Sequence, residues 1–212
     1  MTFNDRILRV APQAHLVYKR AFGDAAALLE KYGITTPLRT AHFVAQVLHE
    51  SGRMRILTES LNYSVAALVS KYVPRRLSRE LAEQLGRSGS RAANQVTIAN
   101  TIYGGTFGRV QLGNTEPSDG WTYRGHGLMQ LTGRGNFRRI GKRLAIDLEA
   151  NPSLALDPRY AFEIPCVFWA DGHCNDAADR DDIVAVTKGI NGGTNGLAER
   201  RELLTLTKAV FV

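Results

Sequence analysis

Two acidic residues, Glu50 and Glu59, stand nine positions apart in the stretch HESGRMRILTES, residues 49–60. Two carboxyls that face one sugar are the machinery of glycoside hydrolysis, in which one protonates the leaving oxygen and the other acts on water or on the sugar. The apolar neighbours Val47 and Leu48 suit Glu50 to the acid, and the polar neighbours of Glu59 suit it to the base. Glutamates at this spacing are common, however, so by themselves they indicate solvated surface charges more often than a catalytic pair.

The segment between the two glutamates has to bend if the carboxyls are to meet. In one continuous helix, nine residues turn through about 900°, which leaves the two side chains on opposite faces, and an odd spacing along a strand does the same. Thr36 as N-cap and Pro37 in the first turn predict the start of a helix, and Gly52 predicts its end. We therefore expect Glu50 in the last turn of that helix and Glu59 on a loop that folds back towards it.

Helical periodicity extends through most of the chain and predicts a mainly α fold. Further helices are expected at 14–32, 66–71, 78–86, 91–103, 134–148, 158–171 and 179–188, and in the C-terminal segment from residue 196. Residues 104–127 are rich in Gly, Asn, Ser and Asp without a helical period, so they predict an ordered loop region, and a short hairpin is expected near 56–64. A chain of 212 residues with 44% hydrophobic residues predicts one domain over 1–212, in which 65–103 form a smaller helical lobe.

Several apolar residues elsewhere in the chain are expected to have a structural role. Trp169 lies in an apolar helical stretch, which favours a core position over a sugar platform, and Cys166 and Cys174 are expected to be free thiols. The C-terminal segment is first basic and then apolar. It is expected to pack into the core through Leu203, Leu204, Leu206 and Val210, and the alternative is an amphipathic helix that disturbs membranes.

The net charge of +7 predicts a polyanion or an anionic surface as partner. Nucleic acid, acidic lipid head groups and bacterial wall polymers all qualify, but the 27 Lys and Arg residues are spread along the chain and form no known nucleic-acid-binding motif. We therefore expect no specific nucleic-acid partner. The apolar runs are too short to cross a bilayer and the N-terminus lacks a signal-peptide core, so we expect a protein made in the cytoplasm without a transmembrane segment.

Other active-site chemistries find little support. The zinc-protease motif needs a second histidine four residues after His49, where Arg53 stands, and His42 is expected to be structural. No glycine-rich stretch forms a phosphate loop, and no serine lies in a G-x-S-x-G turn. The sequence thus predicts neither a metal nor a cofactor.

Four segments, taken in order along the chain, favour a catalytic pair over two surface charges. They are AHFVAQVLHESGRMRILTESLNYS (41–64), DGWTYRGHGLMQLTGRGNF (119–137), NPSLALDPRYAFEIPCVFWADG (151–172) and VTKGINGGTNGLAERR (186–201). Together they resemble family 19 glycoside hydrolases, the chitinase class with a lysozyme-like α-helical fold, and are most similar to its phage-endolysin branch. The resemblance implies a bilobal single domain with a catalytic cleft, and no separate wall-binding module is evident.

The resemblance also implies roles for individual residues. Glu50 becomes the general acid and Glu59 the general base of an inverting mechanism. Thr132 falls where a hydroxyl holds the attacking water, and Gln130 falls where a side chain lines the sugar site.

Further positions match substrate contacts of the family. Asn191 and Arg200 fall where residues bind substrate or support the acidic pair, and Tyr63 and Trp121 are looser assignments as stacking surfaces for sugar rings. His126 departs from the family, which more often has Arg there, so a salt bridge at that position is in doubt.

The function implied is that of an endolysin, an antimicrobial enzyme of bacteriophage or prophage origin that hydrolyses β-1,4 bonds of peptidoglycan and lyses the host cell. Its expected partners are glycan strands and the anionic cell envelope, its expected state is a monomer, and it would reach the periplasm and cell wall through a separate pore. Two alternatives stay open: a chitinase with the same chemistry, and a non-catalytic wall-binding or membrane-disrupting cationic protein.

Overall fold

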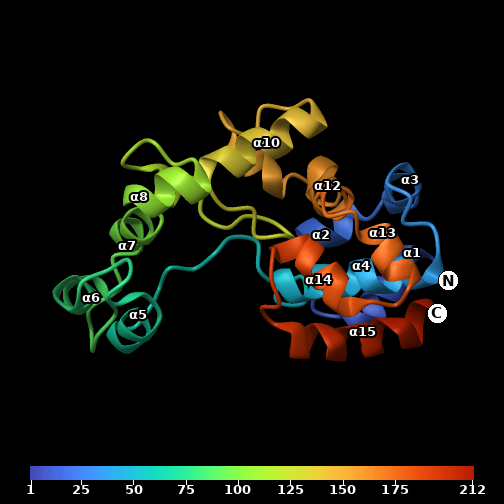
Figure 1. Ribbon diagram of the computed structural model, residues 1–212, viewed down its shortest axis with the longest axis horizontal. Helices are drawn as coiled ribbons and strands as arrows, with labels where there is room; N and C mark the ends of the chain where they lie inside the picture. The colour runs from blue at the N-terminus through green and yellow to red at the C-terminus, as the bar shows by residue number, and fades with distance from the viewer. The chain divides into compact units, whose positions relative to one another are not determined.

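The computed structural model describes residues 1–212 and is mainly helical, as the sequence predicts (Figure 1). The elements are α1 (Phe3–Val10), α2 (Leu16–Ala21), α3 (Ala25–Lys31), α4 (Pro37–Glu50), α5 (Val65–Tyr72), α6 (Arg79–Leu85), α7 (Gln95–Ile102), α8 (Gly105–Phe107), the π-helix η1 (Gly108–Leu112), α9 (Asp119–Thr122), α10 (Arg134–Leu144), the 3₁₀ helix η2 (Pro152–Leu156), α11 (Pro158–Ala161), α12 (Glu163–Asp171), α13 (Cys174–Asp179), α14 (Ile183–Asn191) and α15 (Leu197–Phe211). Strand pairing is limited to isolated bridges.

Several predicted elements are wrong in detail. The hairpin near 56–64 does not form, because Thr58 pairs with the distant His126, which in turn pairs with Leu131. The region 104–127 is not only loop, because it contains α8, η1 and α9. These helices are too short to show a helical hydrophobic period in the sequence. The sequence also missed α1.

Three predicted helices are interrupted. Residues 22–24 separate α2 from α3, residue 162 separates α11 from α12, and the helix expected at 179–188 is the end of α13 followed by α14. At the first break, Phe22 is buried in the core while Gly23 and Asp24 are exposed, so the chain turns there around an apolar anchor.

Contacts divide the chain into two compact units. Unit 1 comprises 1–57, 127–130 and 153–212, and unit 2 comprises 58–126 and 131–152. The predicted helical lobe at 65–103 lies within unit 2.

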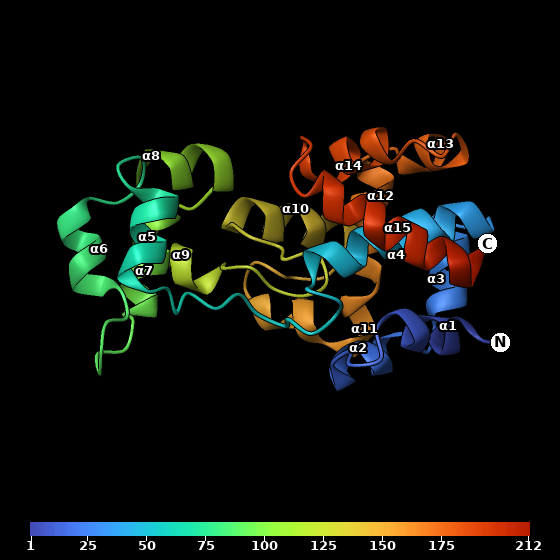
Figure 2. The ribbon, with the colours of Figure 1, turned by 90° about the horizontal axis from the view of Figure 1, so that it is seen from below.

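Helix α4 is the centre of unit 1. All residues from Thr40 to Leu48 are buried, and α15 packs along it (Figure 2). Trp169 is fully buried and meets Phe43 edge-on, which confirms its core position, and both cysteines are free and buried.

The C-terminal helix α15 packs into this core through one face. Leu203 and Leu204 are buried as expected, together with Thr207 and Phe211. Leu206 is 36% exposed, contrary to the prediction, because it points away from the face that these four residues share.

Unit 2 has a smaller core. It consists of Leu61, Leu68, Leu77, Ala82, Leu85, Ile98, Ala99 and Ile102. Helices α7 and α9 meet closely at Gly120, where a Cβ would lie 2.4 Å from the Ala99 carbonyl oxygen. None of the helices in either unit has the length and apolar character needed to span a membrane.

Candidate functional site

Glu50 occupies the last position of α4, as the local signals predict. At the start of the helix, the Thr36 hydroxyl accepts a hydrogen bond from the Arg39 amide at 3.1 Å. At its end, the chain leaves through Gly52, Arg53 and Met54, all with φ between 55° and 61°. Two non-glycine residues in the left-handed region make this a strained exit, directly after the candidate acid.

The Glu50 carboxylate is ion-paired with the Arg200 guanidinium of α15. Arg200 is 1% exposed, and its other nitrogens donate to the Gln46 side-chain oxygen and, at 3.2 Å, to the Asn195 carbonyl oxygen. The Glu50 side chain is 21% exposed, so the carboxyl is anchored on one side and reaches solvent on the other. The contacts to Gln46 and Asn195 hold the guanidinium in place, and one of its nitrogens binds the Glu50 carboxylate.

Asn191 lies close to this pair through the loop between α14 and α15. Its amide nitrogen donates to the Asn195 carbonyl oxygen at 3.1 Å, the same oxygen that Arg200 contacts, and its side-chain oxygen accepts from the Gly193 amide at 2.8 Å. Gly196, with φ of 71°, ends the loop against the ring of His49, where a Cβ would lie 2.3 Å from a ring carbon. Unit 1 therefore gathers Glu50, Arg200 and Asn191.

Glu59 is held entirely within unit 2. Its amide donates to the Gly125 carbonyl oxygen at 2.8 Å, and its carboxylate accepts from the Gly125 amide at 3.3 Å. The Tyr103 hydroxyl donates to the two carboxylate oxygens, at 2.7 and 2.9 Å. Burial, together with the nearby Glu59 charge, raises the pKa of Tyr103, so this hydroxyl stays protonated at neutral pH.

The two residues proposed as sugar platforms pack against the small core of unit 2, and each carries a cation. The Arg124 guanidinium lies 3.7 Å from the Trp121 ring centroid and donates to the Trp121 carbonyl oxygen at 2.7 Å. Burial lowers the pKa of Arg124, while the Glu59 charge opposes that shift. The Lys71 ammonium lies 5.0 Å from the Tyr63 ring centroid. These contacts are cation–π pairs.

The QLTG segment is divided between the units. Gln130, in unit 1, has a φ of 45°, and its side-chain amide donates to the Gly127 carbonyl oxygen at 3.0 Å. Thr132, in unit 2, is half-buried, and its backbone carbonyl oxygen accepts from the side-chain amide of Asn136 at 2.8 Å. That these two residues and both glutamates serve one bound sugar stays a prediction.

His126 is buried, its ring Nδ1 donates to the Arg124 carbonyl oxygen, and the ring meets Phe137 edge-on. Burial lowers the pKa of His126, which favours the neutral ring. This position therefore carries a hydrogen-bonded neutral side chain in place of the arginine that the family more often has there.

Sequence reasoning missed Gln46, Tyr103 and Arg124. Arg124 stands inside the recognised segment 119–137 but received no role, and Tyr103 is 44 residues from its partner Glu59. Only Gln46 carried a local signal, because it lies one helical turn before Glu50. No group of His, Cys, Asp and Glu side chains is arranged to hold a metal ion.

Comparisons with known proteins give similar proteins of one kind, glycoside hydrolases of family 19 and chitinases. No family model matches the chain. A Haemophilus influenzae protein described as a glycosyl hydrolase family 19 domain-containing protein is 32% identical over 206 residues, which cover 96% of this chain and 92% of that protein.

Solved structures share the fold at low identity. Chitinase C from Streptomyces griseus is similar with a TM-score of 0.63 at 18% identity, over 98% of this chain and 75% of that one. A class IV family 19 chitinase from Zea mays is similar with a TM-score of 0.52 at 16% identity, over 99% of this chain and 90% of that one.

Proposed function

The chain belongs to glycoside hydrolase family 19, and from that premise we propose that it hydrolyses β-1,4 glycosidic bonds of bacterial peptidoglycan by an inverting acid–base mechanism. In this reaction Glu50 donates a proton to the glycosidic oxygen, and Glu59 removes a proton from the water that attacks the opposite face of the sugar. The mechanism requires the two carboxyls to lie roughly 6.5–9.5 Å apart, so that the water fits between sugar and base.

The surrounding residues have supporting roles in the proposal. Arg200 holds the Glu50 carboxyl, and Thr132 helps to hold the water. Gln130 and Asn191 bind sugar hydroxyl and acetamido groups through their amides, which offer both donors and acceptors. Tyr63 and Trp121 present to the sugars the parts of their rings that Lys71 and Arg124 leave uncovered.

The observation that carries the choice of peptidoglycan is the pairing of a cation with each proposed platform, Arg124 with Trp121 and Lys71 with Tyr63. Chitin is a neutral polymer of the same β-1,4-linked N-acetylated amino sugars, whereas peptidoglycan carries carboxylates on its stem peptides. Cations beside the sugar rings complement these carboxylates and gain nothing from chitin. The net charge of +7 acts in the same direction over the whole surface, because it concentrates the enzyme at an anionic envelope.

The biological role that fits this substrate is host-cell lysis as a phage or prophage endolysin. The enzyme would be made in the host cytoplasm, pass a separate pore, and act as a monomer on the wall.

The test is a turbidity assay on permeabilised Gram-negative cells beside an assay on soluble chitin oligomers. We expect lysis with little chitin turnover. Replacement of the platform cation in Arg124→Gln should lower the lysis rate by a larger factor than it lowers chitin turnover, each relative to the parent. Arg109→Gln, an exposed arginine of η1, is the matched control for lost charge. Efficient chitin turnover without lysis would establish the chitinase alternative. Undiminished lysis by Glu50→Gln would establish a non-catalytic wall-binding or membrane-disrupting protein.

A further inference from the structure

We propose that Tyr103 is a positioning residue for Glu59, and that Asn114 and Arg134 hold the backbone of Tyr103 in place. This inference rests on the proposed function, in which Glu59 is the base. Nothing in the sequence assigns a role to these three residues.

The first observation is the geometry of the Tyr103 hydroxyl. It lies 2.7 Å from one carboxylate oxygen of Glu59 and 2.9 Å from the other. A hydroxyl has a single proton, so this proton is shared between the two oxygens and holds the carboxylate end of the side chain in place. The Gly125 amide adds one contact, at 3.3 Å, to only one of these oxygens. Tyr103 is therefore the main restraint on the position of the carboxylate.

The second observation is that the Tyr103 hydroxyl is held in place and stays protonated. The Tyr103 ring packs against the core of unit 2, and Tyr103 is the C-cap residue of α7, so its backbone is anchored in a helix end. Its raised pKa keeps the proton on the hydroxyl throughout the pH range in which a glutamate base is ionised.

The third observation is a chain of contacts behind Tyr103. The side-chain amide nitrogen of Asn114 donates to the Tyr103 carbonyl oxygen at 2.9 Å. The side-chain oxygen of Asn114 accepts from the backbone amide of Arg134 at 2.8 Å. Asn114 is buried, so both of its contacts are protected from water. At Gly108 the backbone passes so close to Tyr103 that a Cβ would lie 2.0 Å from the same carbonyl oxygen.

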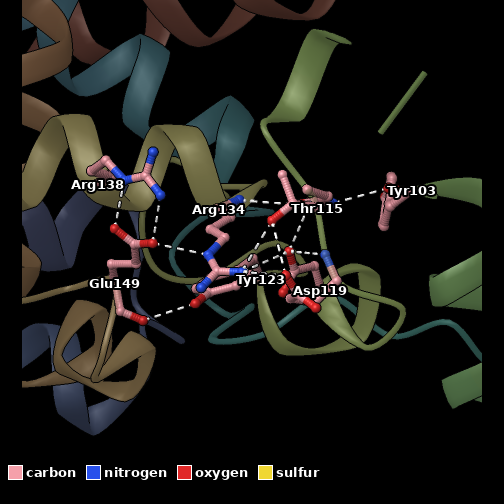
Figure 3. Close-up of polar contacts among 9 residues, drawn as sticks. Tyr103, Thr115, Asp119, Tyr123, Arg134, Arg138 and Glu149 are labelled. Atoms are coloured by element: carbon pink, nitrogen blue, oxygen red, sulfur yellow. Dashed lines mark hydrogen bonds and ion pairs between the residues drawn. The ribbon is translucent and has the colours of Figure 1, made fainter. Parts of the chain in front are cut away.

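Arg134 is fixed in turn by carboxylates on two sides, as Figure 3 shows. It donates to Glu149 at 2.9 Å and to Asp119 at 3.3 Å. Asp119 also accepts from the amides of Thr115 and Glu116, at 2.8 and 2.9 Å. The loop that carries Asn114 is thus tied to the first turn of α10, and through Asn114 to Tyr103.

This arrangement has a purpose that core packing alone does not explain. A general base acts only while a lone pair points at the water, and small errors in placement cost large factors in rate. A carboxylate on a loop has free side-chain torsions, and one rigid donor shared by both oxygens removes much of that freedom.

The test is Tyr103→Phe, which keeps the ring and removes the hydroxyl. We expect kcat on peptidoglycan to fall roughly tenfold to a hundredfold and KM to change by less than about twofold, because the base is displaced while the substrate contacts remain. The matched control is Tyr18→Phe, which removes a hydroxyl-to-carbonyl hydrogen bond of 2.6 Å to Ile56 and should leave both properties near those of the parent.

Two further variants separate the possible causes. In a Glu59→Gln background, Tyr103→Phe should change the residual kcat by less than about twofold, because Tyr103 acts only through the ionised base. Asn114→Ser, which shortens the side chain behind Tyr103, should lower kcat in the same direction by a smaller factor, and it replaces Tyr103→Phe if that variant does not fold.

The outcomes are distinguishable. If Glu59→Gln is inactive and Tyr103→Phe keeps the kcat of the parent, the positioning role is wrong and the proposed function stands. If Glu59→Gln keeps full activity, the assignment of the base is wrong. If Tyr103→Phe lowers the residual kcat of Glu59→Gln by the full factor, its effect is structural and the positioning role is overturned.

Discussion

Arg200 and Glu50 form an ion pair across 150 residues of sequence, with the arginine buried in unit 1 and the carboxylate at the partly exposed end of α4. The Arg200 guanidinium contacts the Gln46 side chain and the Asn195 carbonyl oxygen as well, so three groups depend on one side chain. The candidate acid is therefore built on the contact between α4 and α15, the pair of helices at the centre of unit 1.

Removal of this arginine should destabilise the fold. In Arg200→Met the partners lose their donors and a carboxylate is left without its cation, so the free energy of unfolding should fall by about 3 kcal/mol, near the low end for a broken buried pair because Glu50 reaches solvent. Urea unfolding measures it. Arg201→Met, at the exposed next position, should cost less than about 0.5 kcal/mol. Equal unfolding midpoints for the two variants would contradict the role of the ion pair.

Replacement of either glutamate should abolish cleavage without loss of the fold. Glu50→Gln and Glu59→Gln should each lower kcat by about 10²–10⁴-fold, since each removes one proton-transfer group and keeps its shape. Product release from purified peptidoglycan gives the rate, and thermal unfolding confirms the fold. Glu202→Gln, an exposed glutamate of α15, should retain the activity of the parent. A Glu50→Gln variant as active as Glu202→Gln would rule out the acid assignment.

Loss of the Thr132 hydroxyl should have a milder effect. In Thr132→Val the shape is nearly kept and one contact to the attacking water is removed, so we expect kcat to fall about tenfold, less than for either glutamate. Thr101→Val, which removes a hydroxyl that donates to the Thr97 carbonyl oxygen on the exposed face of α7, is the control. A loss as large as that of Glu59→Gln would mean that Thr132 does more than hold water.

The Glu149 carboxylate should make the stability of unit 2 depend on pH. Hydrogen bonds from Arg138 and Arg134 lower the pKa of Glu149 from 4.5 to about 2. A lowered folded-state pKa contributes stability that is fully present above about pH 4.5 and is lost as the pH falls towards about 2. Because water screens the partly exposed Arg138, the contribution should be of the order of 1 kcal/mol.

Thermal unfolding of Glu149→Gln between pH 2 and pH 7 tests this expectation. The variant should be less stable than the parent at neutral pH, and the two curves should converge near pH 2. Glu83→Gln, an exposed glutamate of α6, should follow the parent throughout. A gap between parent and Glu149→Gln that is constant over this range would exclude the ion pairs as its cause.

Some features could be predicted because their signals are local. The cap at Thr36, the proline after it and the glycine at 52 bound α4 through the preferences of single residues, and they place Glu50 in its last turn. The apolar period along the chain gives the mainly α class in the same way. The resemblance of four ordered segments adds the family, which the 32% identical relative confirms.

Local signals could not give the breaks at Phe22 and Phe162 or the turns within 104–127. At each of these places the chain turns according to what it packs against, and a buried Phe22 looks the same in the sequence as a residue in mid-helix. The same limit applies to Leu206, whose exposure depends on which face of α15 meets α4.

The helical class, the family and the two candidate carboxyls could all be read from the order of the residues alone. The residues that hold them are apparent only in the folded chain: Arg200, itself bound by Gln46, for Glu50, and Tyr103 and Gly125 for Glu59. All of these partners except Gln46 are remote in the chain, and a hydrogen bond between distant residues does not affect the hydrophobic period or the capping preference of either segment.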